Sequence, residues 1–390
     1  MSVAECLQRA AERSPRLKAG AHRTEAATLR ARQADRPLNP RLETEAAKVG
    51  GTGEARGLES TEFTVSVSQE FELGSKRRHR TEAAQAETAV NRVEEEANVR
   101  TVLAETRQAA LAVLAAQERV CLAEETAALA RETEAVAEAR ERAGQATVLE
   151  TERARAETAK ARIACEARQA DQREAVRALA FCWGETEPSF DAVTGAFGSA
   201  PPPLPPVDAL VVSAATQPDR RADEARVRAY AARVGVERAE RVPNAGVSIG
   251  GRRFQENRDF GFVIGVGVEL PFFTRNRDGV RAAEAEAEAV RLDADAARLR
   301  TESRVRQLYA RLGALSAQAV RQRETVLPLV ERALERIQEA NRQGKAGYLD
   351  VLEARRARVD VRGEWIDTVT EYHAVFIELA WLTGAFPETL

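Results

Sequence analysis

The chain has 390 residues, of which 31% are charged and only 5% are aromatic, and its formal net charge at pH 7 is −3. This charge balance gives no electrostatic reason to expect a nucleic-acid partner. No apolar run approaches the roughly 20 residues that a membrane-spanning helix needs, so an α-helical membrane protein is excluded. The abundance of alanine, glutamate and arginine instead indicates long helices or coiled coil.

The first part of the chain predicts a helix followed by strands. Residues 3–35 carry apolar side chains at helical spacing, with a break at Pro15. Residues 41–49 alternate weakly between apolar and polar, whereas Thr61–Leu73 alternates clearly. A period of two predicts a strand with one apolar and one polar face. The apolar face carries Phe63, Val65, Val67, Phe71 and Leu73.

A long helical hairpin is predicted after these strands. The segment Ser75–Arg142 contains neither proline nor glycine, and a continuous helix of this length would extend roughly 100 Å. The run breaks at Gly144, and a return helix is predicted over Thr147–Cys182. The sequence therefore predicts two long helices that meet at a tight turn.

The second half of the chain repeats the first. Gly144 and Gly344 are separated by 200 residues (344 − 144), and the same shift places Leu149 on Leu349. We therefore predict a first repeat over residues 1–200, a proline-rich linker over 201–206 and a second repeat over 207–390. The elements expected in the second repeat are a helix (Val207–Arg241), two strands (Ala245–Phe254 and Asp259–Phe272) and a helical hairpin (Val280–Arg342 and Tyr348–Leu382) with a kink near Pro328.

Each half thus contributes two strands, which makes four in the whole chain. Four strands with amphipathic faces do not close a barrel alone, and their edges would be exposed. Symmetric association of several chains would close the sheet.

The order of elements, the repeat and several short motifs resemble the TolC-type outer-membrane efflux proteins. Within that family the chain is most similar to the channel subunits of tripartite heavy-metal exporters. The segments that carry the resemblance are Ala10–Leu17 (AAERSPRL), Pro37–Leu42 (PLNPRL), Gln69–Arg78 (QEFELGSKRR), Leu270–Arg277 (LPFFTRNR) and Gly344–Arg355 (GKAGYLDVLEAR). Each motif is weak alone, but their order along the whole chain makes the set specific.

This resemblance implies a mostly α-helical fold with a membrane β-barrel. In a homotrimer, four strands from each of three chains would close a twelve-stranded barrel in the outer membrane, above an α-helical tunnel across the periplasm. The implied partners are a periplasmic adaptor protein, an inner-membrane RND-type pump and outer-membrane lipid. The channel would be a passive conduit for metal cations or small toxic compounds, without a cofactor, a resident metal or enzymatic activity.

The resemblance also points to acidic residues that would narrow the pore. Asp350 and Glu353 follow the Gly344 turn and match a ring of carboxylates in the best-known member of the family. Three copies of each acid around a narrow pore would favour cations. The alternative is that both acids are solvated side chains on a charge-rich helix. The tyrosine and arginine that latch that member's closed state are replaced here by Asn341 and Ala346, so the latch is absent.

The two turns between long helices are the expected adaptor-docking tips, because exposed hairpin ends are natural contact points. The residues at these tips are Gly144, Gln145, Gly344 and Lys345. Cys121 and Cys165 lie on either side of Gly144 at comparable distances, and they either pair across the hairpin or stay unpaired.

A soluble coiled-coil scaffold is the alternative function. The composition fits it, and no signal peptide is visible at the start of this chain, so an outer-membrane protein would need a leader outside it. The alternating strands favour the channel, since a scaffold has no use for them. An enzyme is the least expected class, because no nucleophile constellation, phosphate loop or metal motif is present.

Overall fold

The computed structural model describes residues 1–53, 57–198 and 204–384, and the chain divides into two compact units. The helical unit comprises Met1–Ala19, Glu96–Gln217 and the described residues from Arg298 onward. The strand-bearing unit comprises Gly20–Glu95 and Pro218–Ala297. Each unit draws on both halves of the sequence, so the division into two repeats stays a prediction. Residues 201–203 of the predicted linker lie outside the described residues.

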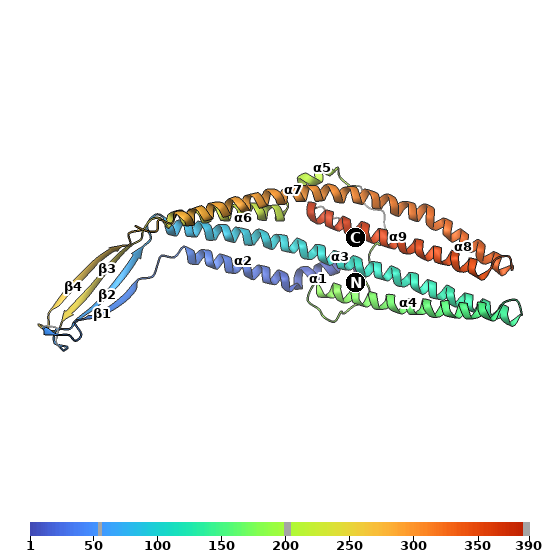
Figure 1. Cartoon of the computed structure of the whole chain (residues 1–390), viewed down its shortest axis with the longest axis horizontal. Coiled ribbons are helices and arrows are strands. Elements are labelled where there is room, and N and C mark those ends of the chain that lie inside the picture. The colour runs from blue at the N-terminus through green and yellow to red at the C-terminus, as the bar shows by residue number, and fades with distance from the viewer. Residues whose placement is uncertain (54–56, 199–203, 385–390) are drawn as a thin grey trace. The chain divides into compact units, whose positions relative to one another are not determined.

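Helices dominate the structure, and the strands lie between them in the sequence (Figure 1). In chain order the elements are α1 (Val3–Arg13), α2 (Pro15–Ala34), β1 (Arg41–Ala47), β2 (Glu62–Phe71), α3 (Lys76–Arg142), α4 (Val148–Phe181), α5 (Val207–Ala215), α6 (Pro218–Ala239), β3 (Ala245–Phe254), β4 (Phe260–Val268), α7 (Arg277–Arg321), η2 (Gln322–Val326), α8 (Leu327–Arg342) and α9 (Tyr348–Thr383). Within the described ranges, no helix is both long enough and apolar enough to cross a membrane.

Proline sets the helix breaks in both halves of the chain. The predicted break at Pro15 is confirmed, since α1 ends at Arg13 and Pro15 opens α2. The prediction of one helix over Val207–Arg241 is wrong, because α5 ends at Ala215 and α6 begins at Pro218. A proline has no N–H to donate into a preceding turn, and it disfavours helical geometry in the residue before it.

Near Pro328, where the sequence predicts a kink, the structure contains a short π-helix, η2, just before α8. Pro328 has no backbone N–H with which to bond the carbonyl four residues earlier. The Leu327 N–H bonds instead to the Gln322 carbonyl, five residues back. The backbone hydrogen bond just before the proline therefore spans five residues instead of four, as in other π-bulges.

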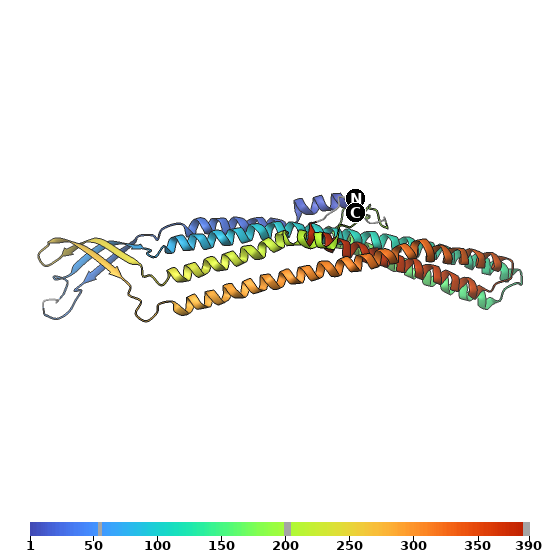
Figure 2. The ribbon, with the colours of Figure 1, turned by 90° about the horizontal axis from the view of Figure 1, so that it is seen from above.

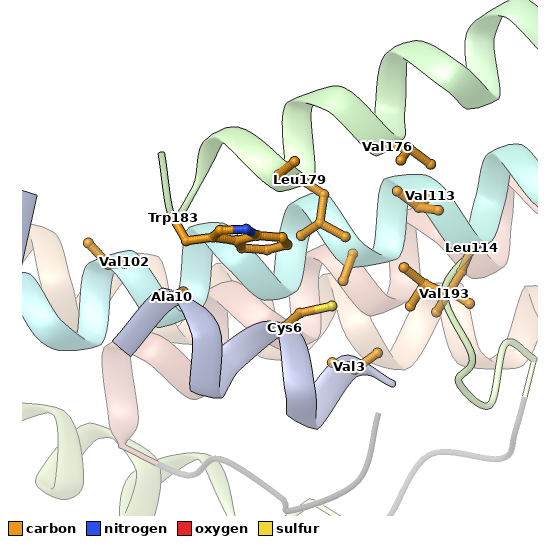
Figure 3. Packing of buried hydrophobic residues seen from close by; sticks show 12 residues of the cluster. Val3, Cys6, Ala10, Val102, Val113, Leu114, Val176, Leu179, Trp183 and Val193 are labelled. Atoms are coloured by element: carbon orange, nitrogen blue, oxygen red, sulfur yellow. The ribbon is translucent and has the colours of Figure 1, made fainter. Parts of the chain in front are cut away.

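The helical unit contains an apolar core built from α1, α3 and α4 (Figure 3). On α3, Ala110 and Val113 are fully buried in this core. Leu179 of α4 and Cys6 of α1 are fully buried among them, and Trp183 packs against the same cluster. A second cluster joins α5, α7 and α9 around Leu312 and Leu379.

Truncating Leu179 to alanine is expected to destabilise the helical unit by about 2–5 kcal/mol, the range for a fully buried leucine. The matched control is Phe181→Ala, because that ring lies two residues away on the same helix and is 74% exposed. Urea unfolding followed by circular dichroism measures both changes. Equal midpoints for the two variants would contradict the assignment of Leu179 to the core.

The strand-bearing unit contains one antiparallel sheet in the order β1-β2-β3-β4 (Figure 1). The central pair, β2 with β3, joins the two halves of the sequence. Val67 of β2 lies opposite Leu42 of β1 and Ile249 of β3, and Ile249 lies opposite Ile264 of β4. Apolar side chains thus align across the whole sheet on one face, which confirms the face assignment for Thr61–Leu73.

The last strand is shorter than the sequence pattern predicts. Alternation continues to Phe272, but β4 ends at Val268. Val268 lies opposite Ala245, the first residue of β3, so no partner residue on β3 remains for Leu270 or Phe272. Pairing length, rather than side-chain alternation, therefore sets where β4 ends.

Candidate functional site

The two helical hairpins of the helical unit end in tips with the same backbone geometry. In the first tip, between α3 and α4, Gly144 has φ +71° and the Gln145 N–H bonds to the Arg140 carbonyl at 2.8 Å. In the second tip, between α8 and α9, Gly344 has φ +74° and the Lys345 N–H bonds to the Ala340 carbonyl at 2.8 Å. This is the Schellman arrangement, in which a left-handed glycine ends the helix.

The predicted docking residues are exposed in this structure. The first tip exposes Gly144 and Gln145, and the second tip exposes Gly344 and Lys345. Both views place the two tips at the same end of the helical unit (Figures 1 and 2).

Sequence reasoning missed three apolar side chains that follow the turns. Val148, Leu149 and Leu349 are 64%, 59% and 55% exposed at the starts of α4 and α9. The sequence did contain a signal for these exposed side chains, namely an apolar residue directly after each predicted turn. At the end of a hairpin, such a residue has little of its own hairpin around it to bury it. Each tip therefore combines an open backbone turn with exposed apolar side chains.

The two tips differ in how the returning helix is capped. In the first, the Thr147 hydroxyl accepts from the Glu150 N–H at 3.3 Å. In the second, Gly347 has no side chain for this purpose, and the Asp350 carboxylate accepts from the Gly347 N–H at 2.8 Å. Asp350 therefore supplies an acidic cap that its counterpart Glu150 does not need to supply.

Asp350 and Glu353 are both exposed and lie one helical turn apart on α9. The structure thus places the two predicted constriction residues on one side of a helix just beyond a tip. Their arrangement provides two carboxylates at the surface of the chain, which is compatible with either a pore lining or a solvated face.

Asn341 and Ala346, which the sequence comparison predicts at the family's latch positions, contact each other. The side-chain amide of Asn341 donates to the Ala346 carbonyl at 2.8 Å, within the second tip. The predicted loss of that latch stays a prediction.

The four cysteines are all free. Cys121 is exposed and Cys165 is half-buried, and neither forms the cross-hairpin disulfide considered from the sequence. Cys6 is fully buried, and burial raises the pKa of its thiol to about 11, which leaves it inert as a nucleophile.

The apolar face of the sheet is a second candidate functional surface. Its side chains stay exposed in the single chain: Phe262 is 83%, Val266 is 74% and Ile264 is 73% exposed. A contiguous apolar surface of this kind marks an interaction site with protein or lipid. On the opposite face, Arg252 of β3 reaches across to Glu62 at 3.0 Å and to the Thr64 hydroxyl at 2.9 Å.

The basic run from Lys76 to Arg80 at the start of α3 is largely neutralised by nearby acids. The buried ammonium of Lys76 lies 3.0 Å from Glu240, and Arg80 pairs with Glu72. These ion pairs favour a structural role for the run over a site for anionic lipid.

The family model for outer membrane efflux proteins matches residues 6–185 and again residues 210–385. The chain belongs to the outer membrane efflux protein family. This efflux protein is 33% identical over 299 residues to the nickel and cobalt resistance protein CnrC of Cupriavidus metallidurans, covering 75% of this chain and 70% of CnrC. It is 31% identical over 306 residues to the nickel-cobalt-cadmium resistance protein NccC of Alcaligenes xylosoxydans xylosoxydans, covering 77% and 69% of the two chains.

The fold of the efflux protein is also that of solved channels. The outer membrane channel CmeC of Campylobacter jejuni matches with a TM-score of 0.81 at 15% identity, over 98% of this chain and 85% of CmeC. The resemblance to the efflux family drawn from the sequence is therefore confirmed, and the coiled-coil scaffold is not favoured.

Proposed function

We propose that this efflux protein is the outer-membrane channel of a tripartite exporter and works as a homotrimer. The observation that carries the proposal is the four-stranded sheet, whose exposed apolar face has no partner among the described residues. In the described chain, β1 and β4 each pair on one side only. Three copies would join these edges into a barrel of twelve strands (3 × 4), with the apolar face toward outer-membrane lipid.

The helical hairpins would continue this barrel as a tunnel through the periplasm. The tips at Gly144, Gln145, Gly344 and Lys345, with the exposed apolar residues beside them, would dock a periplasmic adaptor protein bound to an inner-membrane RND-type pump. Asp350 and Glu353 would form the narrow, negatively charged end of the pore. Transport through the channel would be passive, with the pump as the source of energy and no catalytic step.

Metal cations are the proposed substrates. The relatives CnrC and NccC are named as resistance proteins for nickel and cobalt, and for nickel, cobalt and cadmium. A pore end ringed by carboxylates would suit such cations, because negative charge lowers the barrier to cation entry. Small toxic organic compounds are the second class of substrate.

The proposal is tested by expressing the chain behind a secretory leader and measuring the mass of the detergent-extracted protein by light scattering. A stable trimer from the outer-membrane fraction, conducting ions in planar bilayers, is the expected result. A monomer or dimer that needs no detergent would overturn the channel.

A further inference from the structure

A small cavity lies between α7, η2 and α9 in the helical unit, away from the tips and the sheet. Its volume is about 140 Å³. Trp365, Tyr372 and His373 of α9 line one side, and Ala319 and Val320 near the end of α7 line another. An apolar protein cavity of about 150 Å³ holds one benzene molecule. This cavity therefore has room for a single small aromatic ring.

Aromatic side chains gather at this cavity, although aromatics make up only 5% of the chain. The Phe197 ring stands edge-on to Trp365, with the ring centroids 6.2 Å apart, and lies 6.4 Å from the His373 ring. Tyr372 in turn stands edge-on to His373, with the centroids 5.3 Å apart. Because these rings pack against one another, the aromatic wall is formed before any ligand arrives.

The first hairpin shows that the fold does not require aromatic residues at these positions. At the 200-residue shift, the three α9 wall residues correspond to non-aromatic residues of α4, namely Cys165, Gln172 and Arg173. Arg173, the counterpart of the buried His373, is exposed. A packing role common to both hairpins would not explain rings in only one of them. The aromatic wall is therefore particular to the second hairpin.

One nitrogen of the buried His373 side chain is left without a hydrogen bond. His373 is 5% exposed, and among the described residues nothing bonds to its Nε2. Buried polar atoms without a partner are rare in native proteins, because leaving one unpaired is costly. Burial lowers the pKa of His373, so its imidazole is neutral at neutral pH, with one nitrogen that accepts and one that donates. A hydroxyl or N–H group in the cavity would supply the missing partner.

The π-helix η2 provides the charged rim of the cavity. Arg323 and Glu324 both line it and are both exposed. Arg323 Nη1 donates to the Gly198 carbonyl at 3.0 Å. The opposite charges of these two neighbours leave the rim with no net charge to select an ion. Nor do three metal-ligating side chains come together anywhere in the described part of the chain. The surroundings therefore favour a neutral ligand over a cation.

We propose that this cavity binds a small neutral aromatic molecule that carries one hydroxyl or N–H group, with phenol as the simplest case. The ring would fill the space between Trp365, Tyr372 and Val320, and its polar group would hydrogen-bond to His373. All of these residues belong to the helical unit of one chain. Binding therefore requires neither conduction nor the proposed trimer, and the site goes beyond the proposed function.

The test is calorimetric titration of phenol into the full-length protein in detergent, where we expect saturable binding of one phenol per chain. His373→Phe keeps a ring but removes the nitrogens, so phenol should bind about fivefold more weakly, the contribution of one neutral hydrogen bond. Toluene, which needs no polar partner, should bind this variant at least as tightly as the parent. The control His22→Phe makes the same exchange at a side chain that is 81% exposed, and it should match the parent.

Two further variants separate the site from general effects on the fold. Ala319→Phe places a ring in the cavity and should abolish phenol binding, whereas His373→Gln keeps a donor and an acceptor and should retain it. Heats that do not saturate and are equal in all variants would mean that phenol only enters the detergent, and they would overturn the site. Nickel chloride is titrated into the same proteins. Nickel binding that His373→Phe removes, in a parent that does not bind phenol, would make His373 a metal ligand and overturn the aromatic site.

Discussion

Replacing Ile264 with arginine is expected to prevent the protein from assembling in a membrane. Ile264 lies at the middle of β4, opposite Ile249, and is 73% exposed on the apolar face. A cationic side chain on the lipid face at the bilayer midplane costs about 2–4 kcal/mol in each chain. Three copies would multiply that cost in a trimer, which is enough to shift the protein out of the membrane-inserted state.

The neighbouring residue provides a matched control for this change. Val263 lies opposite Gly250 on the polar face of the same strand, where Arg252 is already accommodated. The variant Val263→Arg adds the same charge one residue away and should assemble like the parent. The measurement is the amount of trimer in the outer-membrane fraction, and equal amounts for both variants would contradict a lipid-facing role for the apolar face.

The sequence predicts these faces well because a strand has a fixed period of two. Once Phe63, Val65 and Val67 are seen to alternate with polar residues, the side of the sheet to which each belongs follows directly. The alternation does not show which strands pair with each other, because it carries no information about the neighbouring strand. The central pairing of β2 with β3, and the end of β4 at Val268, depend on contacts between distant parts of the chain.

The tips were predictable for a similar reason. A glycine that interrupts a long alanine-rich and glutamate-rich run indicates a left-handed helix end, and both Gly144 and Gly344 have positive φ. The partners of individual arginines were not predictable from composition or periodicity. Arg155 and Arg355 occupy equivalent positions in similar sequences, yet one pairs within its hairpin and the other reaches Leu129 of another helix. On helices with so many charges, the partner of each arginine depends on tertiary packing.

The hydrogen bond between Asp350 and the Gly347 N–H determines which substitution best tests the predicted constriction. Substitution by alanine would remove both the charge and the hydrogen bond that the Asp350 carboxylate accepts from the Gly347 N–H at the start of α9. Asparagine keeps a side-chain oxygen that can accept from this N–H while removing the charge. The variant Asp350→Asn/Glu353→Gln therefore isolates the electrostatic contribution of the two acids.

Channels carrying Asp350→Asn/Glu353→Gln are expected to lose most of their preference for cations over anions, because the charges that attract cations to the pore end are gone. The measurement is the reversal potential across a bilayer with a salt gradient, which should move toward zero. Glu150→Gln is the control, since Thr147 already caps that helix and Glu150 belongs to the first tip. A reversal potential that stays at the parent value would mean that Asp350 and Glu353 face solvent away from the narrow part of the pore.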